Sequence, residues 1–284
     1  MDKRLTEVPS NEDVEAYKRD GAVILRKLLD RHWVDLLNQG VDRNIANPGP
    51  NFSDFTAPTG GGKCIKDNWA WRHIPEYQEF FRNSPLGAIV GALMEAQEVR
   101  FFEDQFFEKG PGSTTPTPWH QDQPYYEVSG TMCITWIPLD HVERDDCLEL
   151  VAQSHTLGQL FTPTSFSTQD AKYFVDPKQS PLQDVPDIDG HPERYKILAW
   201  EMDPGDIIVF DARTLHCNRG NRSKRRARRI SMRWIAEDVV YDRNVYPWTT
   251  PTLIEGHGIR PGERLTSDLF PLVWTRTRGN VSDR

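Results

Sequence analysis

The sequence predicts a mainly β protein, an antiparallel sandwich or barrel with helices on its flank. Helical patterns lie before Val99, and short strand-like runs separated by turn signals follow it. No helical pattern lies between these runs. This excludes a doubly wound parallel sheet, because the strands of such a sheet alternate with helices.

The N-terminal part is predicted to hold helices with one strand between them. A capping residue followed by apolar residues at helical spacing indicates a helix, as Trp33, Leu37 and Val41 do after Asp30. The predicted elements are a capped helix over 11–20 ended by Gly21, a buried strand over 22–25, a helix from Asp30 to about Ile45, a Gly- and Pro-rich loop over 47–63, and a helix that opens at Ser84-Pro85.

The strands that follow are short and are bounded by turn residues such as Asp203-Pro204-Gly205-Asp206. We expect one domain over residues 1–284, with N-terminal helices at about 11–96, a β core at about 97–238 and a C-terminal extension over 239–284. The extension has little periodicity, and it could wrap the body or cover a mouth. The predicted strands are 99–108, 131–139, 195–202, 206–210 and 228–236.

Composition excludes several function classes. The net charge of −8 makes general binding of nucleic acid or of an anionic membrane unfavourable. No stretch is apolar enough to span a bilayer, and residues 1–7 lack the apolar core of a signal peptide. Because no two cysteines form a C-x-x-C pair, we expect reduced, mostly buried thiols in a cytoplasmic protein. These cysteines are Cys64, Cys133, Cys147 and Cys217.

The strongest chemical signal is the run Trp119-His120-Gln121-Asp122. In a strand, residues i and i+2 share a face, so His120 and Asp122 could present a nitrogen and an oxygen to one point. His216, which follows the predicted strand 206–210, could supply a third ligand. Two His and one carboxylate form the facial triad that leaves positions open on Fe(II). A surface His beside a solvated Asp is the alternative for the H-x-D triplet alone.

A basic cluster between residues 219 and 233 has two interpretations. Most of its members could form a solvated turn, and nucleic-acid binding is the other possibility. One arginine could act more narrowly, because an Arg fork binds a carboxylate with two hydrogen bonds and keeps its charge. The cluster consists of Arg219, Arg222, Lys224, Arg225, Arg226, Arg228, Arg229 and Arg233.

Several motifs, taken in order, resemble the Fe(II)/2-oxoglutarate dioxygenases of the phytanoyl-CoA dioxygenase type. The resemblance covers most of residues 14–236. It rests on the strand after Gly21, Trp119-His120-Gln121-Asp122, Trp136-Ile137-Pro138-Leu139-Asp140, Asp146-Cys147-Leu148-Glu149 with Ser154-His155, Pro204-Gly205-Asp206, and the segment from His216 to Arg229.

This resemblance implies a double-stranded β-helix, the cupin-like jelly roll. It also implies that His120, Asp122 and His216 bind Fe(II) and that Trp136 lies near the cosubstrate. The family usually has its 2-oxoglutarate arginine eleven residues after the distal His, where this sequence has Ala227. Arg229 and Arg228 are therefore both candidates. Arg229 is favoured because it shares a strand face with Ser231, whereas a bulge would favour Arg228.

The activity implied by the resemblance is oxidation of a small organic molecule, in secondary metabolism, with Fe(II), 2-oxoglutarate and O2. A cupin-type metal-dependent isomerase or lyase that does not use 2-oxoglutarate is one alternative. A non-catalytic jelly-roll binding protein is another. We expect a small-molecule substrate, no nucleic-acid or membrane partner, and an oligomeric state that could be a homodimer.

Overall fold

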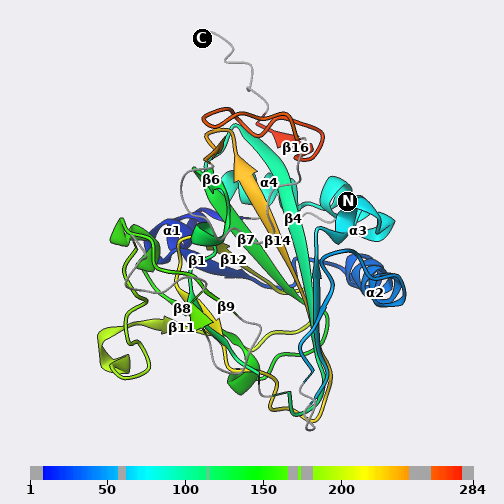
Figure 1. Ribbon diagram of the computed structural model, residues 1–284, viewed down its shortest axis with the longest axis vertical. Helices are drawn as coiled ribbons and strands as arrows, with labels where there is room; N and C mark the ends of the chain where they lie inside the picture. Colours follow the sequence, from blue (N-terminus) through cyan, green and yellow to red (C-terminus); the bar gives the residue numbers. More distant parts are fainter. Residues whose placement is uncertain are drawn as a thin grey trace.

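Two antiparallel sheets form the body of the protein, with helices packed on the outside of the larger one (Figure 1). The computed structural model describes residues 9–56, 62–113, 115–165, 172–173, 182–242 and 257–276. Strands β4, β7 and β14 run through the centre (Figure 1). The main sheet has the order β1 (Ala22–Leu25), β12 (Ile207–Asp211), β7 (Met132–Pro138), β14 (Ala227–Ala236), β4 (Glu98–Lys109), β3 (Cys64–Asn68), β2 (Ser53–Asp54), and β16 (Leu272–Thr275) also pairs with β4.

The smaller sheet carries the short strands on which two of the predicted metal ligands lie. Its order is β11 (Ile197–Leu198), β8 (Leu148–Val151), β13 (His216–Asn218), β5 (Thr117–His120). Two further pairs join β9 (Thr164–Ser165) to β10 (Lys172–Tyr173) and β6 (Val128–Ser129) to β15 (Val240–Tyr241). All pairings between these named strands are antiparallel, as the sequence predicts.

The first two helices begin where capping residues predict. In α1, the Ser10 hydroxyl accepts from the Asp13 backbone N–H, while the Asp13 carboxylate accepts from the Ser10 N–H. Gly21, with φ of 76°, ends this helix in the left-handed region. In α2, Asp30 accepts from the Trp33 N–H. The helices are α1 (Asn11–Asp20), α2 (Arg31–Ala46), α3 (Pro75–Asn83) and α4 (Leu86–Leu93), and the 3-10 turns are η2 (Ala70–Arg72), η3 (Gln123–Tyr125), η4 (Arg144–Asp146), η5 (Ser154–Leu157) and η7 (Pro192–Arg194).

Strand β14 separates the two sides of the main sheet. On the helix side, Trp234 meets Phe101 edge-on at 5.2 Å, and Phe101 stacks on Phe81 of α3 at 4.1 Å between ring centroids. On the other side, alternate residues of β14 face the smaller sheet across a cavity that residues of both sheets line. The apolar core therefore anchors a strand whose opposite face is polar.

Some predicted element boundaries are wrong. Strand β2 lies inside the predicted loop 47–63, and only Ile197–Leu198 of the predicted strand 195–202 is paired as a strand. Strand β3 and helix α3 had no counterpart in the prediction. The sequence of β3 looks polar because it carries Asp67, which is fully buried and accepts hydrogen bonds from the Asn44 side chain and the Gly49 N–H.

The C-terminal region adds two short strands to the body. Strand β15 pairs with β6, and β16 pairs with β4. Residues 243–256 and 277–284 lie outside the described residues, so the expectation that the extension covers a mouth stays a prediction. Among the described helices, none combines the length and the apolar character needed to cross a bilayer.

Candidate active site

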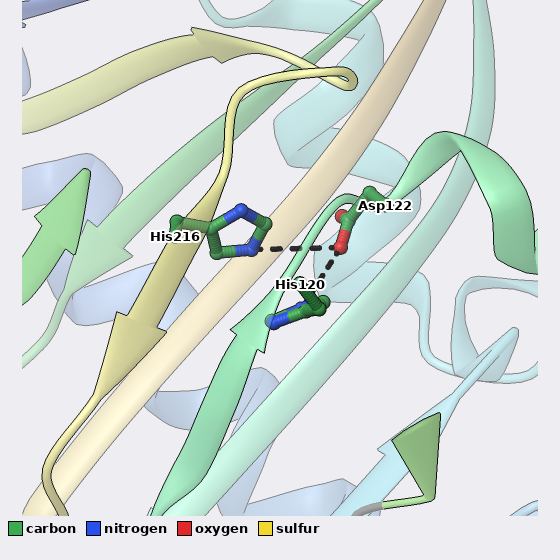
Figure 2. A group of neighbouring side chains, drawn as sticks. All are labelled: His120, Asp122 and His216. Carbon is green, nitrogen blue, oxygen red and sulfur yellow. Dashed lines mark ion pairs between the residues drawn. The ribbon is translucent and has the colours of Figure 1, made fainter. Parts of the chain in front are cut away.

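The three predicted metal ligands converge at one place (Figure 2). His120 is the last residue of β5, and His216, the first residue of β13, is its direct partner in the antiparallel register. Asp122 was predicted to lie in a strand with His120. It lies instead in a helical-type turn, with φ of −78° and ψ of −37°. Its backbone N–H donates to the Ala212 carbonyl at 2.9 Å, which ties the turn to the chain just before β13.

The ligand-type atoms of these side chains lie within 4.8 Å of one another. Asp122 Oδ1 lies 3.3 Å from His120 Nε2 and 3.5 Å from His216 Nε2. All three side chains are buried. Two imidazole nitrogens and one carboxylate oxygen are the donor set of a mononuclear Fe(II) site with open positions. The chemistry and spacing of these donors fit a single ferrous ion.

Backbone carbonyls orient both imidazole rings. The Nδ1 atom of His120 lies 2.8 Å from the Pro118 oxygen, and that of His216 lies 2.9 Å from the Thr214 oxygen. A carbonyl oxygen can only accept, so Nδ1 of each ring carries the hydrogen, and Nε2 carries the lone pair of the neutral ring. Burial and the neighbouring His120 lower the pKa of His216 to about 3, so His216 is neutral at physiological pH.

The carboxylate of Asp122 is held by Arg233 of β14. An Nη2 hydrogen of Arg233 is donated to Asp122 Oδ2 at 2.8 Å, while Oδ1 faces the imidazoles. Burial alone would raise the pKa of Asp122, but the Arg233 guanidinium and the two imidazoles hold it well below its usual range. From the sequence alone, Arg233 is recognised only as a member of the basic cluster. Its position two residues after Ser231 was the signal that it shares the inward face.

The triad forms part of the wall of a cavity of about 360 Å³ between the two sheets. This size suits a small ligand. The lining combines aromatic and apolar side chains with cationic groups on the main sheet. It includes Phe55, Lys66, Phe107, Lys109, Tyr125, Tyr126, Trp136, Leu148, Phe210, Arg229, Ser231 and Arg233.

Of the two arginine candidates, Arg229 reaches this cavity. Its guanidinium lies 5.4 Å from the centre of the Trp136 ring and donates to the Arg228 carbonyl at 2.8 Å. Burial lowers the pKa of Arg229 to about 10, which leaves it charged at neutral pH. Ala227 lines the cavity as well, because residues 227 and 229 share one face of β14. An arginine at position 229 therefore faces the same cavity as an arginine at position 227 would.

Arg228 lies on the opposite face and does not line the cavity. Its guanidinium forms ion pairs with Glu108 and Asp42, each at 2.7 Å. The alternative with a local bulge required Arg228 to reach the cavity, and it does not. The register of β14 with β4 shifts only further along, between Arg233 and Trp234.

The residues that follow Asp122 in and beside turn η3 differ in what they contact. Tyr125 and Tyr126 line the cavity, whereas Gln123 donates from its amide to the Val128 carbonyl at 2.7 Å and is absent from the lining. Tyr126 donates its hydroxyl hydrogen to Glu103, a buried carboxylate beside Arg233. The two tyrosines therefore belong to the cavity wall, and Gln123 belongs to the hydrogen-bond network of the turn.

The Ser154-His155 motif supports the chain that carries His216. The Ser154 hydroxyl accepts from the Leu215 backbone N–H at 2.8 Å. The His155 ring lies 3.1 Å from the Lys18 carbonyl and packs against Gly21, where an added Cβ would approach its Nδ1 to 2.3 Å. The motif therefore joins helix α1 to the smaller sheet next to the site.

Comparison with known proteins agrees with this geometry. A sequence model of the phytanoyl-CoA dioxygenase (PhyH) family matches residues 17–230. The fold is similar to the non-heme α-ketoglutarate-dependent epimerase SnoN from nogalamycin biosynthesis, with 20% identity over 94% of this chain and 97% of that one and a TM-score of 0.71.

Two further solved structures share the fold. The carbocyclase SnoK from nogalamycin biosynthesis has 20% identity, a TM-score of 0.72 and coverage of 94% and 98% of the two chains. EctD from S. alaskensis, solved with 2-oxoglutarate and 5-hydroxyectoine, has 18% identity, a TM-score of 0.61 and coverage of 80% and 76%. The jelly-roll prediction is thereby confirmed. The chain belongs to the phytanoyl-CoA dioxygenase family and is an iron- and 2-oxoglutarate-dependent oxygenase that acts on a small molecule.

Proposed function

We propose that His120, Asp122 and His216 bind the Fe(II) of this oxygenase and that Arg229 binds the distal carboxylate of 2-oxoglutarate. The observation that carries this proposal is the convergence of three ligand-type atoms within 4.8 Å on a cavity that Arg229 also lines. Fe(II), when bound, supplies the activation of O2 that couples conversion of 2-oxoglutarate to succinate and CO2 with oxidation of the substrate.

Residues of the protein orient the metal ligands and supply positive charge for the cosubstrate. Arg233 fixes the carboxylate of Asp122 with Oδ1 directed toward the imidazoles. The Arg229 fork suits a planar carboxylate, and its burial strengthens that attraction. Trp136 packs against the guanidinium and limits its movement. Lys109, the register partner of Ala227, adds a second positive charge to the same part of the cavity.

We propose that the substrate is a small organic molecule of secondary metabolism. Support comes from the roles of SnoN and SnoK in nogalamycin biosynthesis and from the mixed apolar and polar cavity. A metal-dependent isomerase or lyase without 2-oxoglutarate is less favoured, since it has no need of a buried arginine aimed at the metal cavity.

We also propose one catalytic domain, cytoplasmic location and no nucleic-acid partner. The four cysteines are buried and unpaired by disulfides, which suits a reducing compartment. Acidic side chains neutralise much of the basic cluster, since Arg219 pairs with Glu149 and Asp189, and Arg226 pairs with Asp140. Strands β1 and β16 both join the main sheet, which supports a single unit. A homodimer stays a prediction.

The test is formation of succinate from 2-oxoglutarate by the purified protein. The proposal expects formation only when Fe(II), O2 and 2-oxoglutarate are all present, and its loss after chelation with recovery on adding Fe(II). The double variant H120A/H216A is the control for adventitious iron chemistry. Equal succinate formation by this variant, or formation without added iron in chelator, would overturn the assignment of the ligands.

A further inference from the structure

A lysine on β3, the strand between β4 and the short edge strand β2 of the main sheet, lines the cavity away from Arg229. Lys66 lies on β3, opposite Phe107 of β4, and Phe107 lies opposite Arg229 of β14. Adjacent strands are about 4.8 Å apart, so the backbones of Lys66 and Arg229 are separated by about 10 Å across the sheet. Ser53 and Phe55 line the cavity next to Lys66, and we call these three residues the β3 side.

The charge of Lys66 has no anionic partner in direct contact among the described residues. Its Nζ forms no ion pair with a carboxylate of the described residues, and the centre of the Phe55 ring lies 5.6 Å from it. The nearby Glu103 is engaged by Tyr126 and by the Gln105 amide. Burial lowers the pKa of Lys66, and Glu103 only partly offsets this effect.

The other lysine in the cavity differs in this respect. Lys109 Nζ donates to the Thr115 carbonyl at 3.0 Å and to Asn218 Oδ1 at 3.1 Å. Its hydrogen-bonding capacity is therefore largely used by the protein, whereas that of Lys66 is available to a ligand. The Lys66 side chain is only partly shielded from solvent, so an anionic ligand group that displaces water from the cavity would gain a charge-assisted hydrogen bond from its ammonium group.

The rest of the cavity indicates what else the ligand contains. Phe55 and Phe107 flank Lys66, and Tyr125 and Phe210 lie toward the metal ligands. These surfaces favour an apolar or aromatic body between the charged group and the iron. A single ammonium group balances the one negative charge of a carboxylate and leaves half the charge of a phosphate monoester dianion unbalanced.

We infer that the Lys66 ammonium group binds a carboxylate of the substrate, so that the enzyme oxidises an organic acid with an apolar or aromatic body. This inference rests on the proposed function, because it assumes that 2-oxoglutarate occupies Arg229 and leaves the β3 side to the substrate. It assigns to Lys66 the role of a substrate-binding residue that sets specificity.

The experiment measures binding of paired probes to the protein loaded anaerobically with Fe(II) and saturating 2-oxoglutarate. The probes are 3-phenylpropionate, cinnamate and indole-3-acetate, each compared with its neutral amide by isothermal titration calorimetry. Because a hydrogen bond between two charged groups is stronger than one to a neutral amide, at least one acid should bind about tenfold or more tightly than its amide. Lys66→Met should abolish that preference, and Lys66→Arg should retain it.

Lys63→Met is the matched control. Lys63 precedes the same strand, pairs with Glu108 at 3.2 Å and does not line the cavity, so its loss should leave the preference unchanged. The inference is overturned if no acid in the panel binds more tightly than its amide, or if folded Lys66→Met keeps the native preference. If the native protein fails to bind 2-oxoglutarate in the same calorimetric experiment, the proposed function is contradicted instead.

Discussion

Arg233 is the residue whose removal tests the organisation of the site most sharply. Its guanidinium is buried, donates to Asp122 Oδ2 at 2.8 Å, and lies 3.6 Å from Glu103 Oε1. Replacing Arg233 with Met keeps much of the side-chain volume but removes the charge that lies between two buried carboxylates. Asp122 would then lose the contact that directs Oδ1 toward His120 and His216.

Two effects of Arg233→Met can be given magnitudes. Removing one partner of a buried ion pair costs about 3–5 kcal/mol of stability, because a buried charge is left uncompensated. Losing a partner that orients a metal ligand weakens metal binding by about 10- to 100-fold. Bound Fe(II) offsets the charge of Asp122, whereas Glu103, whose pKa burial raises to about 7, can become neutral by taking up a proton. The stability loss should therefore be larger in the iron-free protein than in the iron-loaded protein.

The assay combines anaerobic Fe(II) titration with urea unfolding. Glu103→Gln added to Arg233→Met removes the second buried carboxyl group, which ionises only toward high pH, so above about pH 7 the double variant should recover part of the stability but little of the iron affinity. Arg233→Lys should recover part of the iron affinity. The reasoning fails if folded Arg233→Met binds Fe(II) as tightly as native protein, or if the double variant restores iron affinity together with stability.

Three further predictions concern the ligands, the cosubstrate and pH. His216→Ala should lose Fe(II) binding in the same titration, and retention of one tight equivalent would remove His216 as a ligand. Arg229→Ala should raise the 2-oxoglutarate concentration needed for half-maximal succinate formation by about tenfold or more, because a charge-assisted pair is lost, whereas Arg228→Ala should not. Burial raises the pKa of Asp104 to about 7, while unfolded Asp titrates near pH 4. Native stability should therefore fall as pH rises from about 4 to about 7, by at most about 1.4 kcal/mol per pH unit from this group, and then level off. Urea unfolding of Asp104→Asn should lack this component, and an unchanged pH dependence would contradict the raised pKa.

Strand alternation was enough to predict the inward face of β14. Arg229 and Ser231 both line the cavity, as alternation requires for residues two apart in a regular strand. The same rule gave the right neighbours but the wrong local structure for His120 and Asp122. The chain leaves β5 at His120, and Pro124 in the following 3-10 turn was the local signal that the strand ends there.

Other features depend on contacts that a local pattern does not contain. Strand β3 looks polar because it contains Asp67, and this carboxylate can be buried because Asn44 of helix α2, far from it in the chain, donates a hydrogen bond to it. Arg233 looks like one more cation in a basic cluster, and its burial depends on Asp122, 111 residues away. Charged residues inside a fold are identified by their partners, and the partners are known only once the sheets are assembled.

The most direct test of the central claim is a crystal structure of the protein grown anaerobically with Fe(II), with anomalous data collected at the iron edge. The account predicts one anomalous peak per chain, bonded to Nε2 of His120, Oδ1 of Asp122 and Nε2 of His216. Iron bound elsewhere, or no peak among these three side chains in iron-replete crystals, would contradict it.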